Sequence, residues 1–373
     1  MNTHQTAAVT SSLIPSRLFH PSYLFRYSLL IYLFLIIYAS LYPMSGWRDQ
    51  GMNIFAFITA SFPRYFTWFD LATNFVAYLP LGLLAVLSIQ PYLRSKLAIF
   101  PAIILGVTLS LLLEATQNFL PTRIPSNMDL LFNSLGTLVG AIVSWYYSGP
   151  LLDGQLYKLR QRWFESSKRT DWGLIVLGLW LFTQLNPAGL LFGNGDFRSY
   201  IQYREGISYP PKLFIRFEAG VVLCSIVGIG LLISSLIKKS PFNFGFFFLV
   251  VALAIKTFAV ALLYKPENFL VWVTKGSIIG LILGVGVLAL ALKIPRARHL
   301  MVAIFVLAIA TVLVNLAPAN PYLTSSLQLW NQGQFLNFNG LTRLVSELWP
   351  FLALIYLTAL AWHARKSRRS DQV

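Results

Sequence analysis

The sequence predicts an all-α fold, a polytopic transmembrane helix bundle of about ten spans. Of its 373 residues, 56% are hydrophobic and only 11% are charged, whereas soluble domains carry about 25% charged residues. Mean hydropathy is +0.65, and the apolar residues fall in runs near the length of about 20 residues that a membrane helix needs. No run alternates as in a β-barrel, the other architecture that satisfies its own backbone in lipid. The composition excludes a cytosolic enzyme, a disulfide-rich secreted protein and a disordered chain.

Ten apolar segments are the predicted spans. They are residues 23–41, 69–90, 97–118, 129–147, 172–191, 213–236, 244–264, 270–292, 298–317 and 348–364. No small-residue cleavage site follows the first span, so we expect an uncleaved signal anchor. The predicted parts are a polar N-terminal segment (1–22), a four-span domain (23–147), a basic cytoplasmic linker (148–171), a six-span membrane domain (172–364) and a basic cytoplasmic tail (365–373).

The net charge of +16 has a topological explanation. With the N-terminus in the cytoplasm, the inner segments hold more than twice as many Lys and Arg residues as the outer loops, as the positive-inside rule requires. An even number of spans returns the C-terminus to the same side, so both termini are expected in the cytoplasm. The basic tail suits anionic membrane lipid. No nucleic-acid partner is expected, because no stacking platform or groove-reading helix accompanies the charge.

Polar side chains mark the predicted outer ends of the second, third and fourth spans. Each span contributes an acid and an amide three or four residues apart, which places both on one helix face. The pairs are Asp70 with Asn74, Glu114 with Gln117, and Asp129 with Asn133, and the loop at 121–126 adds Arg123. Charges are expensive in hydrocarbon, so a group of them at one depth needs partners or a task. Gly82, Gly136 and Gly140 predict close helix packing beside them.

Each of these residues has a structural and a functional reading. Asp70 and Asp129 complement the positive ends of their helices, and Asn74 and Asn133 join helices by hydrogen bonds. Glu114 lies near a helix C-terminus, where the dipole disfavours a negative charge, so a functional role is favoured there. Arg123 is either the counter-charge of Glu114 or Asp129, or a phosphate-binding group.

The ordered pattern resembles the VanZ-like family of bacterial membrane proteins over about residues 25–147, followed here by a C-terminal multi-span extension. The resemblance rests on Asp70-x3-Asn74-x5-Pro80-x-Gly82 and on Glu114-x2-Gln117-x5-Arg123-x5-Asp129-x3-Asn133-x2-Gly136-x3-Gly140. The family is named for a protein linked to teicoplanin resistance. The resemblance implies a multi-pass protein of the bacterial inner membrane with a role in the cell envelope or in antibiotic resistance. It supplies no reaction.

The six-span domain carries its own intramembrane charges. Glu218, Lys256 and Lys275 lie within predicted spans, and pairing of Glu218 with one of the lysines is the economical arrangement. Residues Gly276, Gly280 and Gly284 form a small-residue packing stripe. A sharper hypothesis is that both halves of the chain line one outward-opening polar cavity.

Three functions remain open from the sequence. The first is a binding or resistance factor for a lipid-linked or anionic envelope intermediate, such as a polyprenyl-phosphate or glycopeptide-type ligand. In it, Arg123 holds the anion and Asp70, Asn74, Glu114, Gln117, Asp129 and Asn133 bind the rest. The second is an enzyme acting on an isoprenoid phosphate or lipid head group, with Glu114 and Asp129 as catalytic candidates. The third is a transporter or flippase that uses Glu218, Lys256 and Lys275.

Cofactor chemistry has little support in the sequence. No HExxH, Walker loop, GxSxG or paired CxxC motif occurs. We therefore expect no metal or cofactor, and a divalent cation only if the protein is the enzyme.

Overall fold

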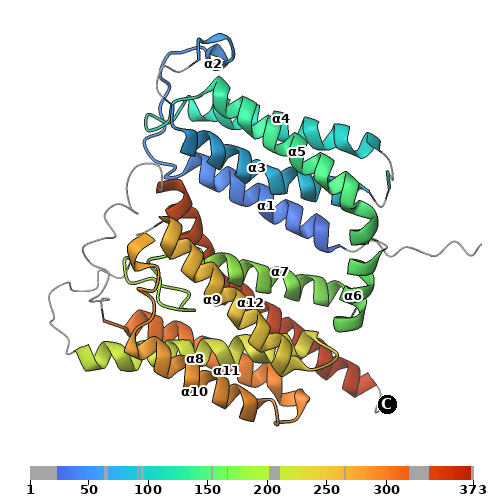
Figure 1. The fold of residues 1–373 in the computed structure, drawn as a ribbon, viewed down its shortest axis with the longest axis vertical. Helices are drawn as coiled ribbons and strands as arrows, with labels where there is room; N and C mark the ends of the chain where they lie inside the picture. Colours follow the sequence, from blue (N-terminus) through green and yellow to red (C-terminus); the bar gives the residue numbers. More distant parts are fainter. Residues whose placement is uncertain are drawn as a thin grey trace, which may run out of the picture.

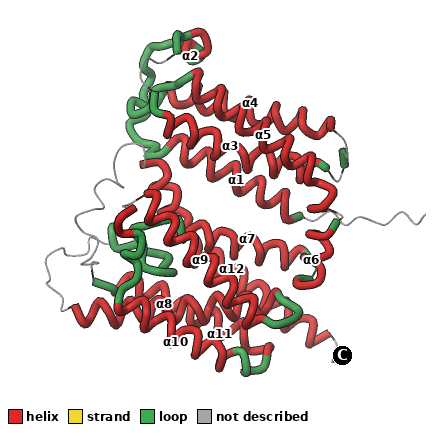
Figure 2. The backbone as a smooth tube through the Cα atoms, in the orientation of Figure 1, coloured by secondary structure: helices red, strands yellow, loops and turns green. Residues whose placement is uncertain are grey.

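The computed structural model describes residues 23–62, 66–90, 92–93, 96–152, 154–165, 167–200, 211–263, 266–318 and 336–370. Throughout these ranges the regular elements are helices, which confirms the all-α prediction (Figures 1 and 2). They are α1 (Leu24–Leu41), α2 (Ala56–Thr59), α3 (Trp68–Ile89), η1 (Lys96–Ala98), α4 (Ile99–Gln117), α5 (Asn127–Leu152), α6 (Gln155–Trp163), α7 (Lys168–Thr183), α8 (Pro211–Leu236), α9 (Pro241–Leu263), η2 (Pro266–Asn268), α10 (Lys275–Ala291), α11 (Arg296–Leu316) and α12 (Leu336–Ser370).

Eight helices of the described part are long and apolar enough to cross a membrane: α1, α3, α4 (with η1), α5, α8, α9, α11 and α12. At the positions of the other two predicted spans, α10 has 17 residues and α7 has 16. The helix predicted at 172–191 ends earlier, at Thr183. Pro187 disfavours helical backbone at Asn186, and the Asn186 side chain accepts a hydrogen bond from the amide of Ala188 at 2.9 Å. This side-chain turn competes with the helix.

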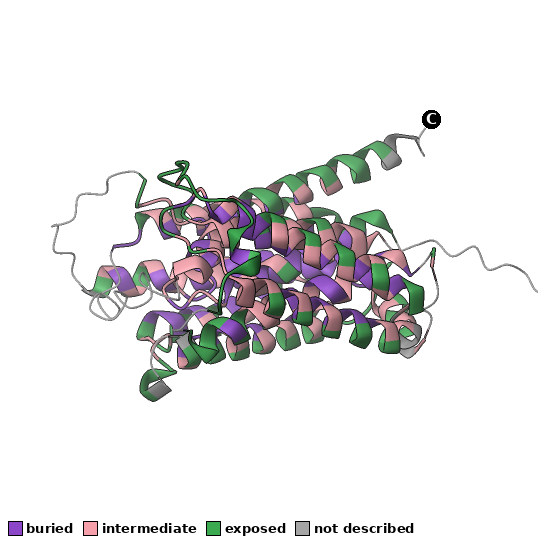
Figure 3. Cartoon of the chain, turned by 90° about the horizontal axis from the view of Figure 1, so that it is seen from above, coloured by how far each residue is buried: buried purple, intermediate pink, exposed green. Residues whose placement is uncertain are grey.

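The last helix is longer than predicted. The apolar pattern predicted a span at 348–364, whereas α12 runs over 35 residues and contains Pro350. The first three turns mix apolar with polar and charged side chains, so hydropathy alone did not include them. The C-terminal end of α12 projects away from the other helices (Figure 3).

The buried apolar side chains form separate clusters in the two halves of the chain. Two small clusters join α1, α3, α4 and α5, and one large cluster joins helices from α7 to α12. Figure 1 shows the same arrangement, with α1 and α3–α5 in one layer of helices and α8, α10 and α11 at the opposite end. Between them, α1 contacts both α7 and α12.

Glycines set the approach of α3 to α5, as the sequence predicted. A Cβ atom on Gly82 would lie 2.0 Å from the carbonyl oxygen of Thr137, and one on Gly140 would lie 2.0 Å from that of Leu79. Gly136 faces the carbonyl oxygen of Phe75 in the same way. The two backbones therefore touch, which small residues permit between membrane helices. This contact fixes the relative position of the polar groups that the two helices carry.

Candidate functional site

The polar site lies where α3 begins, α4 ends and α5 begins. The start of α3 is fixed by Thr67, whose hydroxyl oxygen accepts a hydrogen bond from the amide of Asp70 at 3.1 Å. The Thr67 hydroxyl in turn donates to the Asp70 carboxylate at 2.5 Å. This cap satisfies one of the free amides in the first turn of the helix. Asp70 is exposed, so it borders the site and stabilises the helix that carries Asn74.

Glu114 is the most deeply buried acid of the site, with 3% of its surface exposed. One of its carboxylate oxygens accepts a hydrogen bond from the amide of Ser126 at 2.8 Å. The Ser126 hydroxyl accepts from the amide of Met128 at 3.2 Å, so the loop and the first turn of α5 are organised together. A buried carboxylate bonded to a backbone amide is a charge-assisted contact. Glu114 thus holds the loop that contains Arg123.

Asp129 completes a group of three acids. The side chain of Asn74 hydrogen-bonds to the Asp129 carboxylate, and the charges of Asp70 and Arg123 act on it. Glu114 also lies within electrostatic range of Asp129. Like charges at this range destabilise one another, so the grouping is not explained by packing alone.

A buried oxygen atom without a hydrogen-bond partner lies beside these acids. Asn133 donates through Nδ2 to the Ser110 hydroxyl at 2.9 Å, while its Oδ1 has no partner. The Tyr78 hydroxyl interacts with the Ser110 side chain and lies within electrostatic range of Glu114 and Asp129. Buried polar groups are nearly always satisfied. An exception beside clustered acids is typical of a binding site.

Tyr78 and Ser110 were missed in the sequence. Both continue a helical spacing that was already noted, since Asp70, Asn74 and Tyr78 are four residues apart, as are Ser110 and Glu114. That spacing was the available signal. A tyrosine inside an apolar run reads as core, and its position beside two acids appears only in the folded chain.

Arg123 and Gln117 connect the site to other elements. Gln117 donates to the carbonyl oxygen of Ser40 in α1 at 2.9 Å. Arg123 donates through Nη2 to the carbonyl oxygen of Tyr42 and to Oδ1 of Asn337 in α12, while its Nε has no partner. Burial lowers the pKa of Arg123, and the charges of Glu114 and Asp129 oppose this shift. The three ion pairs found in the described part of the chain do not include Arg123, so its charge acts on Glu114 and Asp129 without direct contact.

Comparison with known proteins identifies this part of the chain. Residues 27–148 match the family model VanZ/LLP1. They form a VanZ-like domain. No match was found among curated proteins or solved structures. Together with the apolar helices, the match indicates a multi-pass membrane protein that contains a VanZ-like domain, and all seven predicted polar residues lie within that domain.

The charges beyond the VanZ-like domain are held separately. Glu218 accepts a hydrogen bond from the Thr274 hydroxyl at the start of α10. Lys256, 2% exposed, donates to the carbonyl oxygens of Asn186 at 2.6 Å and Gly189 at 2.9 Å. Lys275 is exposed. None of the three belongs to an ion pair found among the described residues, so the predicted pairing is wrong.

The two sets of charges are not brought into one cavity. Glu218 on α8 and Lys275 on α10 lie at the end of the molecule opposite α3, α4 and α5, with α7 and α12 between (Figure 1). In the described residues, no three His, Cys, Asp or Glu side chains come together as a metal site. The residues that converge are those of the VanZ-like domain.

A further polar cluster was not singled out in the sequence. Arg198 bonds to Asp196 at 2.6 Å, and Arg343 bonds to Glu347 at 2.8 Å. Burial raises the pKa of Asp196, but the hydrogen bonds and charge of Arg198 outweigh it, so the net pKa is lowered. The four-residue spacing of Arg343 and Glu347 was a usable signal. Each charge has a partner here, which is typical of a structural role.

Proposed function

We propose that the VanZ-like domain binds the anionic head group of a lipid-linked cell-envelope intermediate at its outer face. One observation carries the proposal, the convergence of Glu114, Asp129, Tyr78 and Asn133 beside Arg123. The carboxylates and the unpartnered Oδ1 atom of Asn133 supply acceptors for sugar hydroxyls or peptide amides. A guanidinium supplies paired donors for phosphate or carboxylate.

The proposed setting is the bacterial inner membrane, with ten spans and both termini in the cytoplasm. The excess of Lys and Arg in alternate loops supports this orientation. It places the ends of α3, α4 and α5 that carry the site at the outer face. A lipid-linked ligand then reaches Arg123 from the outer leaflet while its hydrocarbon stays in the bilayer.

Native mass spectrometry of lipids that co-purify with the protein tests the proposal. The variant is Arg123→Ala combined with Glu114→Gln, and the matched control is Arg48→Ala, which removes an exposed arginine from the preceding loop. We expect a polyprenyl-phosphate species on the wild type and on the control, and its loss from the double variant. Glu114→Gln keeps an oxygen for the Ser126 amide, so the loop should still fold.

Equal lipid retention by all three proteins would overturn the proposal and assign the polar groups to helix-end packing. A second variant, Arg123→Lys, keeps the charge but loses the paired donors. It should retain less lipid than the wild type and more than Arg123→Ala. Chemical conversion of the bound lipid by the wild type, lost in Glu114→Gln, would favour the enzyme over the binding factor.

A further inference from the structure

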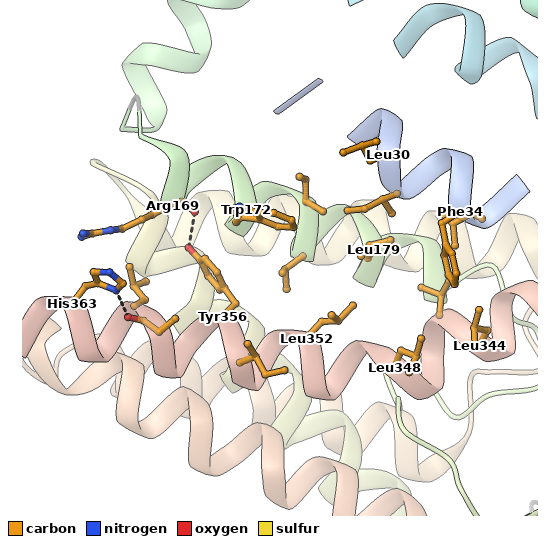
Figure 4. A pocket seen from close by; sticks show the side chains of 18 residues that line it. Leu30, Phe34, Arg169, Trp172, Leu179, Leu344, Leu348, Leu352, Tyr356 and His363 are labelled. Carbon is orange, nitrogen blue, oxygen red and sulfur yellow. Dashed lines mark hydrogen bonds between the residues drawn. The ribbon is translucent and has the colours of Figure 1, made fainter. Parts of the chain in front are cut away.

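An apolar cavity of ≈ 700 Å³ separates the two halves of the chain between α1, α7 and α12 (Figure 4). Its walls carry large apolar side chains from all three helices, among them Leu30, Phe34, Leu179, Leu348 and Leu352. It lies away from Arg123 and involves none of the residues of the proposed head-group site. A ligand in this cavity would therefore be distinct from the ligand of the proposed head-group site.

Several side chains of this cavity are open to the membrane rather than covered by the chain. Leu30 is 62% exposed, Phe34 is 52% exposed and Ile355 is 65% exposed. On helices that cross a bilayer such side chains meet hydrocarbon, because lipid is the solvent there. The cavity is thus a hydrocarbon-filled groove by position and by chemistry.

The two ends of the groove differ in charge. Arg169, Tyr356 and His363 gather at one end, whereas Phe34 and Leu344 lie at the other (Figure 4). The Tyr356 hydroxyl donates to the carbonyl oxygen of Arg169 at 3.1 Å, which ties α12 to α7 at this point. His363 donates through Nδ1 to the carbonyl oxygen of Ala359 at 2.7 Å, so its Nε2 is directed away from its own helix.

The charged end also has the composition of a membrane interface. Trp172 stacks on Tyr27 of α1 with ring centroids 4.5 Å apart. Lys168 lies over the ring of Tyr23, 4.3 Å from its centroid. Aromatic rings with basic residues beside them mark the depth of lipid head groups. The proposed orientation puts this end at the cytoplasmic face, where anionic lipids attract basic residues.

We infer that this groove holds one anionic glycerophospholipid as part of the folded protein. Its acyl chains lie along the apolar walls between α1, α7 and α12. Its phosphate lies beside Arg169 and His363, where a guanidinium offers donors. A second copy of the chain suits the groove less well, because a transmembrane helix would bring no anion to the charged end.

Native mass spectrometry on protein reconstituted with defined lipids tests this inference, with phosphatidylglycerol and phosphatidylcholine as probes. Ala359→Trp fills the charged end of the groove, and Ala297→Trp is the matched control at an exposed alanine of α11. Arg169→Gln removes the charge, with Arg298→Gln on α11 as its control. Wild type and controls should retain one phosphatidylglycerol per chain, and Ala359→Trp should retain none.

Arg169→Gln should weaken phosphatidylglycerol retention about fivefold, as expected for one basic residue near a membrane surface, and leave phosphatidylcholine unaffected. Equal retention of the two lipids by the wild type would overturn the inference. So would lipid retention that Ala359→Trp does not change, or a dimer that Ala359→Trp disrupts while the lipid count stays constant. Loss of the polyprenyl-phosphate in Arg123→Ala with this lipid still bound would separate the two sites.

Discussion

Buried charged side chains are partnered differently in the VanZ-like domain and in the helices from α7 to α12. In the VanZ-like domain Glu114 and Asp129 act on each other, and the Tyr78 hydroxyl and the unpartnered Oδ1 atom of Asn133 lie beside them. In the second region Glu218 and Lys256 are bonded to different elements. Buried polar groups that are satisfied and dispersed stabilise a fold. Groups that converge without all being satisfied are typical of a site, and the comparison therefore favours the first region for the proposed binding.

The largest effect is expected where α3 touches α5. Gly140→Ala would place a methyl group 2.0 Å from the carbonyl oxygen of Leu79, and two packed backbones cannot both move aside. We expect a loss of about 3 kcal/mol in the free energy of unfolding, the upper end for overpacking, measured by chemical denaturation in detergent.

Gly286→Ala on α10 is the control, because a Cβ atom there meets nothing within 4 Å. It should leave stability unchanged or slightly higher, since alanine favours helix over glycine. Equal stability of the two variants would contradict backbone contact as the basis of the first region.

A pair of charge substitutions sharpens the comparison. Lys256→Met leaves the carbonyl oxygens of Asn186 and Gly189 without their donor, so we expect a loss of about 2 kcal/mol of stability and unchanged retention of the polyprenyl-phosphate. Glu114→Gln should change stability by less and abolish most retention. Thermal unfolding and lipid mass spectrometry on the same preparations measure both. The opposite pattern, with retention lost only in Lys256→Met, would move the site to the second region.

A smaller effect is expected at the contact between the two regions. Asn337→Ala removes one of the two acceptors of the Arg123 guanidinium, and we expect a loss of about 1 kcal/mol, seen as a lower Tm. Asn337→Asp keeps an acceptor and should retain the stability of the wild type. A Tm for Asn337→Ala equal to that of the wild type would show that this contact contributes no stability.

The smallest effect concerns pH. The pKa of Asp196 is lowered in the folded protein by Arg198, so the carboxylate stabilises the fold above its unfolded pKa of about 3.9. That contribution is lost as pH falls through the lower, folded value. Between pH 5 and pH 3 the wild type should lose more stability than Asp196→Asn. Parallel curves in acid denaturation would contradict this prediction.

Local sequence patterns predicted most of the helices and part of the candidate site. Hydropathy located the helices, and four-residue glycine spacing predicted close packing at Gly136, Gly140 and Gly280, which the contact of Gly280 with α8 confirms. Helical spacing also predicted that the acids and amides of α3, α4 and α5 lie at one depth. These features depend on residues within a turn or two of each other, which a sequence shows directly.

The predictions that were wrong concern contacts between residues far apart in the sequence. One of the two acceptors of Arg123 is Asn337, 214 residues away, and no local pattern in either segment predicts this contact. Lys256 donates to two backbone carbonyl oxygens, and a pattern of side chains in the sequence cannot predict a contact with the backbone. The pairing of Glu218 with a lysine was argued from the cost of an unpaired charge, but the hydroxyl of Thr274 and the amide of Ser277 serve instead.

The length of α12 has a consequence for how the two ends of the molecule communicate. At about 1.5 Å per residue its 35 residues extend about 52 Å, and about 39 Å of this length separates Asn337, beside Arg123, from His363 at the groove. An anion that takes the Arg123 guanidinium from Asn337 changes the free energy of docking this one helix. Thermodynamic linkage then requires that lipid in the groove changes the affinity for that anion by the same factor. In the proposed orientation, α12 therefore couples a head-group site at the outer leaflet to a lipid site at the inner leaflet.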